Sequence, residues 1–237
     1  MLKLELNPKN EHISQIENWL KEEWNESKSG FLTDWDMIPE SFAENRLSLL
    51  TENDKAIGFA VYRICDDLAV IDIAELKPAL RKKGFAKKFI LETLEFLKSK
   101  NVLVVKLFCS PEISEGFWNK CGFKKFDIPN DNKINMYKVL LSELKPCERI
   151  QSNDVLKLWD CEPYQTDRNE PKWIWNLEYE TDNKTLTKPI VFPAYKDWQL
   201  ELEKDGTVIK NKVKYFPLDL SDNGTFMIIR EISERKH

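Results

Sequence analysis

The sequence predicts an α/β (α+β) fold in which helices flank a mixed sheet, followed by a small all-β domain at the C-terminus. In the first 145 residues, apolar runs of strand length alternate with apolar residues at helical spacing. The apolar run 102–108 follows the strand-like run 68–76 and an intervening helical segment, which indicates parallel pairing through a helical crossover. After Leu158 no long helical period occurs.

The N-terminal region begins with an amphipathic helix, because Ile13, Ile16, Leu20 and Trp24 recur at helical spacing. His12 would lie on the surface of this helix. The other elements expected before residue 145 follow in chain order. They are a short helix within 34–45, a hairpin of 47–50 and 56–63, a strand at 68–76, a helix at 86–97, a strand at 102–108, a short helix ending at Gly122, and a hairpin of 123–126 and 134–140.

The C-terminal half is expected to form a small antiparallel β domain of unknown role. Residues 1–145 are assigned to the first domain, 146–170 to a polar, proline-punctuated linker, and 171–237 to the β domain. Asp205-Gly206 is a tight-turn signal. This half holds Trp159, Trp173, Trp175 and Trp198, which favour either a structural core or a dimer interface or lid over an acceptor cleft. The strand-like runs are 173–179, 190–192, 198–203, 208–216 and 225–232.

The composition argues against several classes of function. A net charge of −4 gives no reason to expect nucleic-acid binding, and no stretch is apolar enough to span a membrane. Five cysteines without a CxxC pair favour reduced thiols and a cytoplasmic protein. With only two histidines, a Ser-His-Asp triad or a multi-histidine metal site is not expected, and no metal is predicted.

The most informative segment joins the strand 68–76 to a lysine-rich helix. Gly84 and Ala86 allow a ligand to approach the backbone, and the first N–H groups of a helix have no partner within it. Arg81, Lys82 and Lys83 add positive charge. The segment therefore predicts a socket for a phosphate or pyrophosphate, the alternative being an ordinary solvated helix start.

Two patterns in this region resemble the GNAT superfamily of acyl-CoA-dependent N-acetyltransferases. Leu76-x-Pro78-x-x-Arg81-x-x-Gly84-x-Ala86 is similar to the family's coenzyme A motif, and Gly116-Phe-Trp-Asn-Lys-Cys-Gly-Phe123 is similar to its [LF]-Y-x-x-x-G-F pattern. The resemblance covers residues 1–143. It implies a mostly antiparallel sheet whose parallel central strands, 68–76 and 102–108, splay apart to admit the coenzyme.

The resemblance also implies which residues contact coenzyme A. Backbone N–H groups from Lys82 to Ala86 would hold the pyrophosphate, with Lys87 close by, and the backbone of Ala74 and Leu76 would bind the pantetheine arm. Trp118 stands where the family has a tyrosine and would form a cofactor wall. The full set is Ala74, Leu76, Arg81, Lys82, Lys83, Gly84, Phe85, Ala86, Lys87 and Trp118.

Acyl transfer to an amine needs a base, an oxyanion donor and a proton for the leaving thiolate. Asp72 lies in an apolar strand, and by alternation its side chain would share a face with Ala74 and Leu76, so it is the first candidate base. Its alternative role is a structural partner for a cation, and Glu75, on the other face, ranks second. For the thiolate, Cys109, Ser110, Tyr137 and water remain open, because Trp118 cannot donate such a proton. The catalytic candidates are Asp72, Glu75 and Tyr137.

These features predict an N-acetyltransferase that moves an acetyl group from acetyl-CoA to a primary amine by direct attack in a ternary complex. The alternative is a non-catalytic acyl-CoA-binding or interaction module, suggested by Trp118 and by Pro111 in place of a family asparagine. The acceptor could be a small molecule or a peptide amine, and a homodimer is an open alternative. Aromatic and acidic residues between Trp19 and Phe42 could hold an ammonium group.

Overall fold

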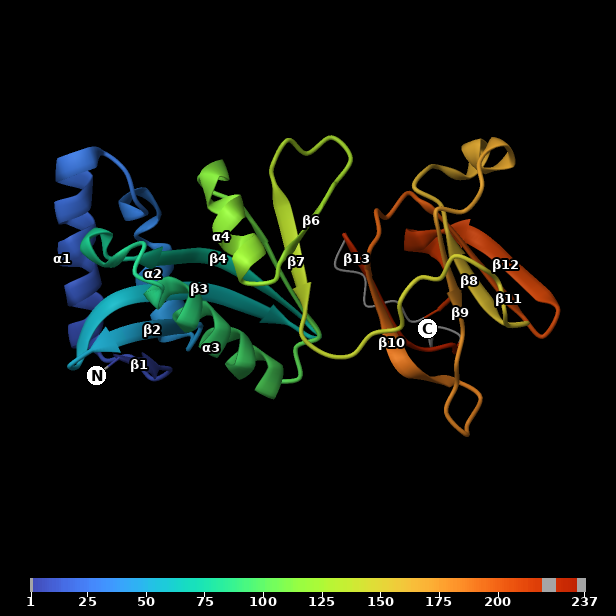
Figure 1. The fold of residues 1–237 in the computed structure, drawn as a ribbon, viewed down its shortest axis with the longest axis horizontal. Coiled ribbons are helices and arrows are strands. Elements are labelled where there is room, and N and C mark those ends of the chain that lie inside the picture. The colour runs from blue at the N-terminus through green and yellow to red at the C-terminus, as the bar shows by residue number, and fades with distance from the viewer. Residues whose placement is uncertain (1, 219–224, 234–237) are drawn as a thin grey trace. The chain divides into compact units, whose positions relative to one another are not determined.

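The computed structural model describes residues 2–218 and 225–233 (Figure 1). The chain divides into two compact units, residues 1–126 with 132–140 and residues 127–131 with 141–237. Each unit has its own hydrophobic core. The two are therefore described separately.

The N-terminal unit contains a seven-stranded sheet with the order β1-β2-β3-β4-β5-β7-β6. Only β4 and β5 are parallel, and all the other neighbours are antiparallel, which confirms the predicted fold class. β7 lies between β5 and β6, and β1 was not predicted from the sequence. The strands are β1 (Leu2–Glu5), β2 (Leu47–Glu52), β3 (Lys55–Cys65), β4 (Leu68–Leu76), β5 (Val104–Phe108), β6 (Lys124–Phe126) and β7 (Asn135–Val139).

The central parallel strands separate along their length. Residues 68–70 of β4 pair with residues 104–106 of β5, and the pairing ends there. β4 nevertheless continues to Leu76, still paired with β3 on its other side. The expected separation is thus confirmed, and it leaves one edge of β4 open over its last residues.

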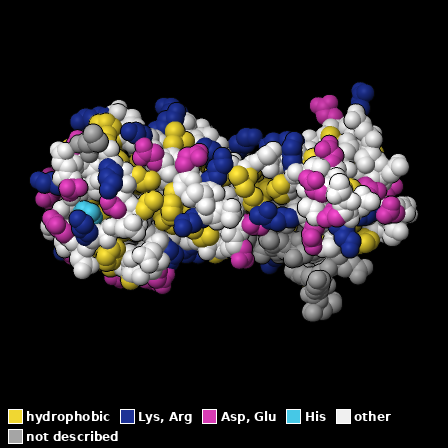
Figure 2. Space-filling model, turned by 90° about the horizontal axis from the view of Figure 1, so that it is seen from below, with side chains coloured by type: hydrophobic (Ala, Val, Ile, Leu, Met, Phe, Trp, Pro, Cys, Tyr) yellow, Lys and Arg dark blue, Asp and Glu magenta, His cyan; other side chains and the backbone are white. Residues whose placement is uncertain are grey.

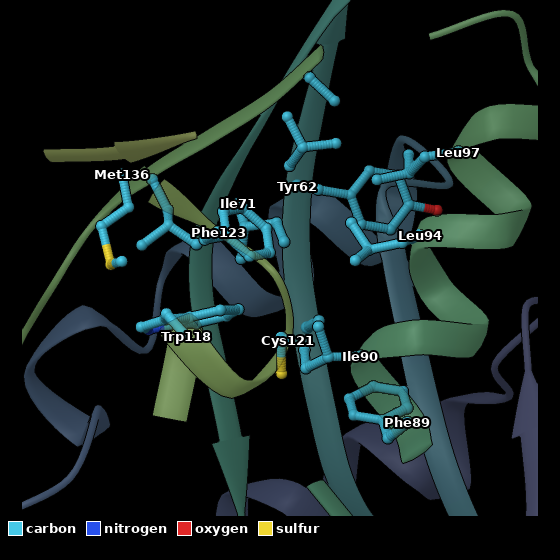
Figure 3. Packing of buried hydrophobic residues seen from close by; sticks show 14 of the residues in the cluster. Tyr62, Ile71, Phe89, Ile90, Leu94, Leu97, Trp118, Cys121, Phe123 and Met136 are labelled. Carbon is cyan, nitrogen blue, oxygen red and sulfur yellow. The ribbon is translucent and has the colours of Figure 1, made fainter. Parts of the chain in front are cut away.

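Helices cover both faces of this sheet. Ile16, Trp19 and Leu20 of α1 pack with Val61 and Ile73 on one face. Helices α3 and α4 pack on the other face, where the cluster in Figure 3 includes Tyr62, the neighbour of Val61. The helices are α1 (Asn10–Ser27), α2 (Met37–Ala43), α3 (Phe85–Ser99) and α4 (Glu115–Lys120), with short 3₁₀ segments at Leu32–Asp34, Pro78–Leu80 and Glu112–Ser114.

His12 is buried, so the expectation of a surface position was wrong. Its side chain is only 4% exposed. Its Nδ1 accepts a hydrogen bond from the backbone N–H of Lys9, at 3.1 Å. The N–H groups at the start of a helix have no partner within it. The imidazole of His12 accepts a hydrogen bond from the N–H of Lys9, the residue just before α1.

A β-bulge changes the alternation of side chains along β4. Ile71 pairs with Tyr62 and Ile73 pairs with Val61, so Asp72 is an extra residue on β4. Ile71 before the bulge and Leu76 after it consequently belong to the same hydrophobic cluster, although one number is odd and the other even. The prediction that Asp72 shares a face with Ala74 and Leu76 assumed unbroken alternation, and it was wrong.

The second unit contains two antiparallel sheets, with the orders β12-β11-β8-β9 and β10-β13. β8 pairs with both β11 and β9. It lies within residues 146–170, so this stretch is not the linker that its polar and proline-rich composition suggested. The strands are β8 (Val155–Leu158), β9 (Trp173–Asn176), β10 (Thr185–Pro193), β11 (Gln199–Lys204), β12 (Thr207–Lys212) and β13 (Phe226–Glu231), with 3₁₀ segments at Pro163–Arg168 and Val213–Tyr215.

The predicted turn and the tryptophans have clear structural roles in this unit. Asp205 and Gly206 both have positive φ and join β11 to β12, as expected for a tight hairpin. Trp175 is fully buried and contacts Phe192 edge-on. Trp173 stacks on Trp198 at the margin of the same core. The aromatic residues therefore supply much of the core between the two sheets.

The cysteines and the surface are consistent with the composition. All five cysteines are free thiols, and Cys109 and Cys121 are buried. Acidic and basic side chains are interspersed on the face shown in Figure 2. Within residues 2–218 and 225–233, the helices lack the combination of length and apolar character needed to cross a membrane.

Replacing Gly58 by alanine should destabilise the N-terminal unit by about 1–3 kcal/mol. A Cβ on Gly58 would lie 3.0 Å from the backbone oxygen of Glu75 and 2.9 Å from Leu76 Cδ1, so β4 would have to shift. Urea unfolding measures the effect. Gly116→Ala in α4 is the control, because nothing lies within 4 Å of its added Cβ. Equal stability of the two variants would contradict the prediction.

Candidate active site

The open end of β4 forms one side of a cavity of about 650 Å³. One wall is the connection between α1 and α2, and another is the segment that leads into α4. The loop that precedes α3 contributes the third. The lining residues are Glu23, Ser29, Gly30, Phe31, Thr33, Asp34, Ala74, Glu75, Leu76, Arg81, Lys82, Ala86, Ser110, Pro111, Ser114 and Phe117.

The loop before α3 presents a row of free backbone N–H groups. Lys82 and Gly84 have φ values of 64° and 84°, so successive N–H groups turn toward one side. Within the described residues, the N–H groups from Lys82 to Lys87 have no hydrogen-bond partner. The exposed side chains of Lys83 and Lys87 add positive charge. This loop can therefore hold an anion such as a pyrophosphate.

The open edge of β4 offers further backbone groups to a ligand. The N–H of Lys77 donates to Ile57 on β3, at 2.8 Å. In an antiparallel pair, alternate residues direct their backbone groups to opposite sides. Ala74 and Leu76 therefore direct theirs away from β3, toward the side where β5 no longer pairs, and both residues line the cavity.

The guanidinium of Arg81 lies between two carboxylates instead of facing the lysine-rich loop. Its Nη2 is 2.6 Å from Glu75 Oε1 and 2.7 Å from Glu23 Oε1. Its Nε donates to the backbone oxygen of Leu76, at 2.9 Å. The side chain of Arg81 is thus used within the protein, and its backbone N–H donates to Pro78.

Glu75 is a carboxylic acid with a near-neutral pKa. The pKa of Glu75 is raised from 4.5 to about 7, chiefly by burial; the positive charge of Arg81 lowers it, and the nearby carboxylate of Glu23 raises it. A group with a pKa near neutrality can accept and release a proton under ordinary conditions. Among the three catalytic candidates from the sequence, Glu75 is the one that lines the cavity.

Asp72, the first candidate base, lies elsewhere. Both of its carboxylate oxygens bind the guanidinium of Arg63, at 2.7 and 2.8 Å. It does not line the cavity. The geometry matches the structural role that was the alternative for this residue.

Lys83, Gly84, Phe85 and Lys87 of the predicted coenzyme set are not part of the cavity lining, and neither are Trp118 and Tyr137. Trp118 is 7% exposed and packs against Phe117 and Phe123, and Figure 3 shows it near Met136 and Cys121. Tyr137 lies on β7, in edge-on contact with Phe126. Phe117, not Trp118, forms part of the wall.

Glu23 is one of the acids between Trp19 and Phe42 that the sequence offered as partners for an ammonium group, without singling it out from its neighbours. It is 5% exposed, although it is acidic. It follows Trp19 and Leu20 by four and three residues, which puts an acid on the buried face of α1. This spacing could have identified Glu23 from the sequence, because a buried acid needs a partner.

The pKa of Glu75 predicts a pH dependence of stability. The pKa of Glu75 is raised in the folded protein, so the folded state binds more protons than the unfolded chain between 4.5 and about 7. The contribution of Glu75 to the unfolding free energy should therefore decrease as the pH rises through this interval. Urea unfolding of the wild type and of Glu75→Gln at several pH values measures this contribution of Glu75. A wild-type minus variant difference that stays constant with pH would contradict the assignment.

Comparisons with known proteins identify the N-terminal region. Residues 12–123 match the model described as "Acetyltransferase (GNAT) family". The PaiA N-acetyltransferase of Thermoplasma acidophilum in complex with coenzyme A is 19% identical, with a TM-score of 0.49 over 59% of this chain and 99% of that one. The ribosomal-protein-S18-alanine N-acetyltransferase of Escherichia coli is 14% identical, with a TM-score of 0.44 over 64% of this chain and 99% of that one. No curated protein matches the chain. The family match contains the loop before α3, all of β4 and the Phe117–Phe123 segment, and residues 12–123 are thus an acetyltransferase domain of the GNAT family.

Proposed function

We propose that the N-terminal unit transfers an acetyl group from acetyl-CoA to a primary amine by direct attack in a ternary complex. The observation that carries the proposal is Glu75. It has a near-neutral pKa and lines the same cavity as Lys82 and Ala86, at the end of the anion-binding loop.

The residues of this cavity fit coenzyme A. The free N–H groups from Lys82 to Lys87 suit the pyrophosphate, and the lysines of this loop suit its charge. The backbone groups that Ala74 directs to the open edge of β4 suit the amide-containing pantetheine arm, whereas the backbone oxygen of Leu76 already accepts from Arg81. When bound, acetyl-CoA supplies a thioester, whose carbonyl carbon accepts a nucleophile.

The side chains of the protein transfer the protons of the reaction. Glu75 takes a proton from the ammonium group of the acceptor, which frees the nitrogen lone pair. The nitrogen–carbon bond forms and the carbon–sulfur bond breaks with its electron pair remaining on sulfur. The second proton of the nitrogen is then lost, and the thiolate takes up one proton and leaves as the thiol. The N–H of Leu76, at the open edge of β4, would stabilise the oxyanion. Ser110 and Ser114 line the facing wall, where a hydroxyl can donate to the departing thiolate.

Replacing Glu75 by glutamine should lower kcat at least about 100-fold, because the amide cannot accept the proton. Thiol release from acetyl-CoA with a panel of amines measures the rate. In the wild type, kcat/KM should rise with pH through the pKa of Glu75, at about 7. This rise should disappear in the variant.

Asp72→Asn is the matched control for this experiment, since Asp72 is an acid of the same strand whose partner is Arg63. Its rate should stay within a few-fold of the wild type. A larger loss in Asp72→Asn than in Glu75→Gln would make Asp72 the base. Tight coenzyme A binding without thiol release from any amine would support a non-catalytic acyl-CoA-binding module.

A charge reversal in the loop tests the coenzyme site. Lys87→Glu should weaken coenzyme A binding about tenfold or more, because it places a negative charge beside the phosphates. Calorimetric titration with coenzyme A measures the affinity. Lys98→Glu makes the same charge change in the last turn of α3 and should have little effect. Equal weakening by both variants would show a general effect of charge and would count against the site.

A further inference from the structure

Glu23 has an oxygen that no group in residues 2–218 and 225–233 satisfies. Its side chain is 4% exposed. Oε1 accepts a hydrogen bond from Arg81, whereas Oε2 is buried and has no partner within the described residues. A buried carboxylate oxygen without a donor is costly, and such atoms concentrate where a ligand supplies the missing group.

The charges around Glu23 also call for a cation. Glu23 Oε1 and Glu75 Oε1 lie 2.7 and 2.6 Å from the same nitrogen of Arg81, so their separation cannot exceed the sum of these distances. Two carboxylates thus share one guanidinium. With both ionised, this corner of the cavity carries a net negative charge, which one bound ammonium group would neutralise.

The surroundings of Oε2 complete a site of suitable shape. Gly30 has a φ of +88°, and a Cβ at this position would lie 3.1 Å from both Cδ and Oε2 of Glu23. Gly30 therefore packs closely against the carboxylate, and a side chain at this position would press on Oε2. Phe31 and Asp34, on the same connection, also line the cavity and can contact a cation through a ring face and a charge.

We propose that Glu23 binds the ammonium group of the acceptor through Oε2 and holds it beside Glu75. The acceptors would then be aliphatic amines, which are charged at neutral pH, rather than aromatic amines or alcohols. This inference rests on the proposed function and adds the class of acceptor to it. Glu23 is a binding and positioning residue, and the proton is transferred to Glu75.

The test is equilibrium binding to the full chain saturated with coenzyme A, where no acetyl group can be transferred. Benzylamine is the charged probe, and benzyl alcohol and aniline are neutral probes of similar size. Ligand-observed NMR at neutral pH measures their affinities. The wild type should bind benzylamine at least about tenfold more tightly than either neutral probe, a difference typical of one charge-assisted hydrogen bond.

Glu23→Gln should remove most of this preference and leave coenzyme A affinity within a few-fold of the wild type. Glu22→Gln is the matched control, because it makes the same charge change at the next residue, which is exposed and outside the cavity lining. Gly30→Ala tests the site independently, since its methyl group would crowd Oε2. It serves as the measurement if Glu23→Gln does not fold.

The outcomes separate this inference from the proposed function. Preference for benzylamine that depends on Glu23, without acetylation of any amine, would support the ammonium site and overturn the transferase. Acetylation of amines with an unchanged preference in both Glu23→Gln and Gly30→Ala would support the transferase and overturn the ammonium site. An equal loss in Glu22→Gln would also overturn it, because the effect would then be long-range charge alone.

Discussion

The arrangement of the candidate site depends on the guanidinium of Arg81. It connects three parts of the unit, since its own loop precedes α3, Glu75 and Leu76 belong to β4, and Glu23 belongs to α1, 58 residues earlier. Without this charge, two largely buried carboxylates would repel each other. Removal of one partner from a buried ion pair typically costs about 3–5 kcal/mol. Since Arg81 is 40% exposed, solvent screens part of that energy.

The second constraint is the edge of β4. A free strand edge in a folded protein is usually covered, because its N–H and C=O groups would otherwise pair with another chain. Here β5 leaves β4 after three paired residues, while β3 remains paired to the end of β4. The open edge thus lies beside a cavity within the unit. The backbone groups at this edge and Glu75, the proposed base, consequently come from one strand, which β3 holds in place.

The sequence predicted the parts of this site that are local in the chain. The coenzyme motif lies within eleven residues, and glycine and lysine there have direct physical meanings, so the strand 68–76 and the loop before α3 were foreseen with the correct bounds. The features that depend on pairing between strands could not be predicted in this way. Alternation ranked Asp72 before Glu75, but a bulge that only the register with β3 reveals removes Asp72 from the face of Ala74 and Leu76, and Arg63 binds its carboxylate. The short strand β8 escaped notice for the same reason, because its four residues gain stability only between β9 and β11.

The position of Arg81 also links the coenzyme loop to the base. The motif alone suggested that this arginine adds charge to a phosphate socket, whereas its side chain turns back to Glu75 and Glu23. Its positive charge lowers the pKa of Glu75 against the effects of burial and of Glu23. Any displacement of the loop that moves Arg81 away from Glu75 would therefore raise the pKa of that carboxyl group and favour its protonated form, which cannot act as a base. It follows that the ionisation of Glu75 depends on the conformation of the loop that we propose binds the coenzyme.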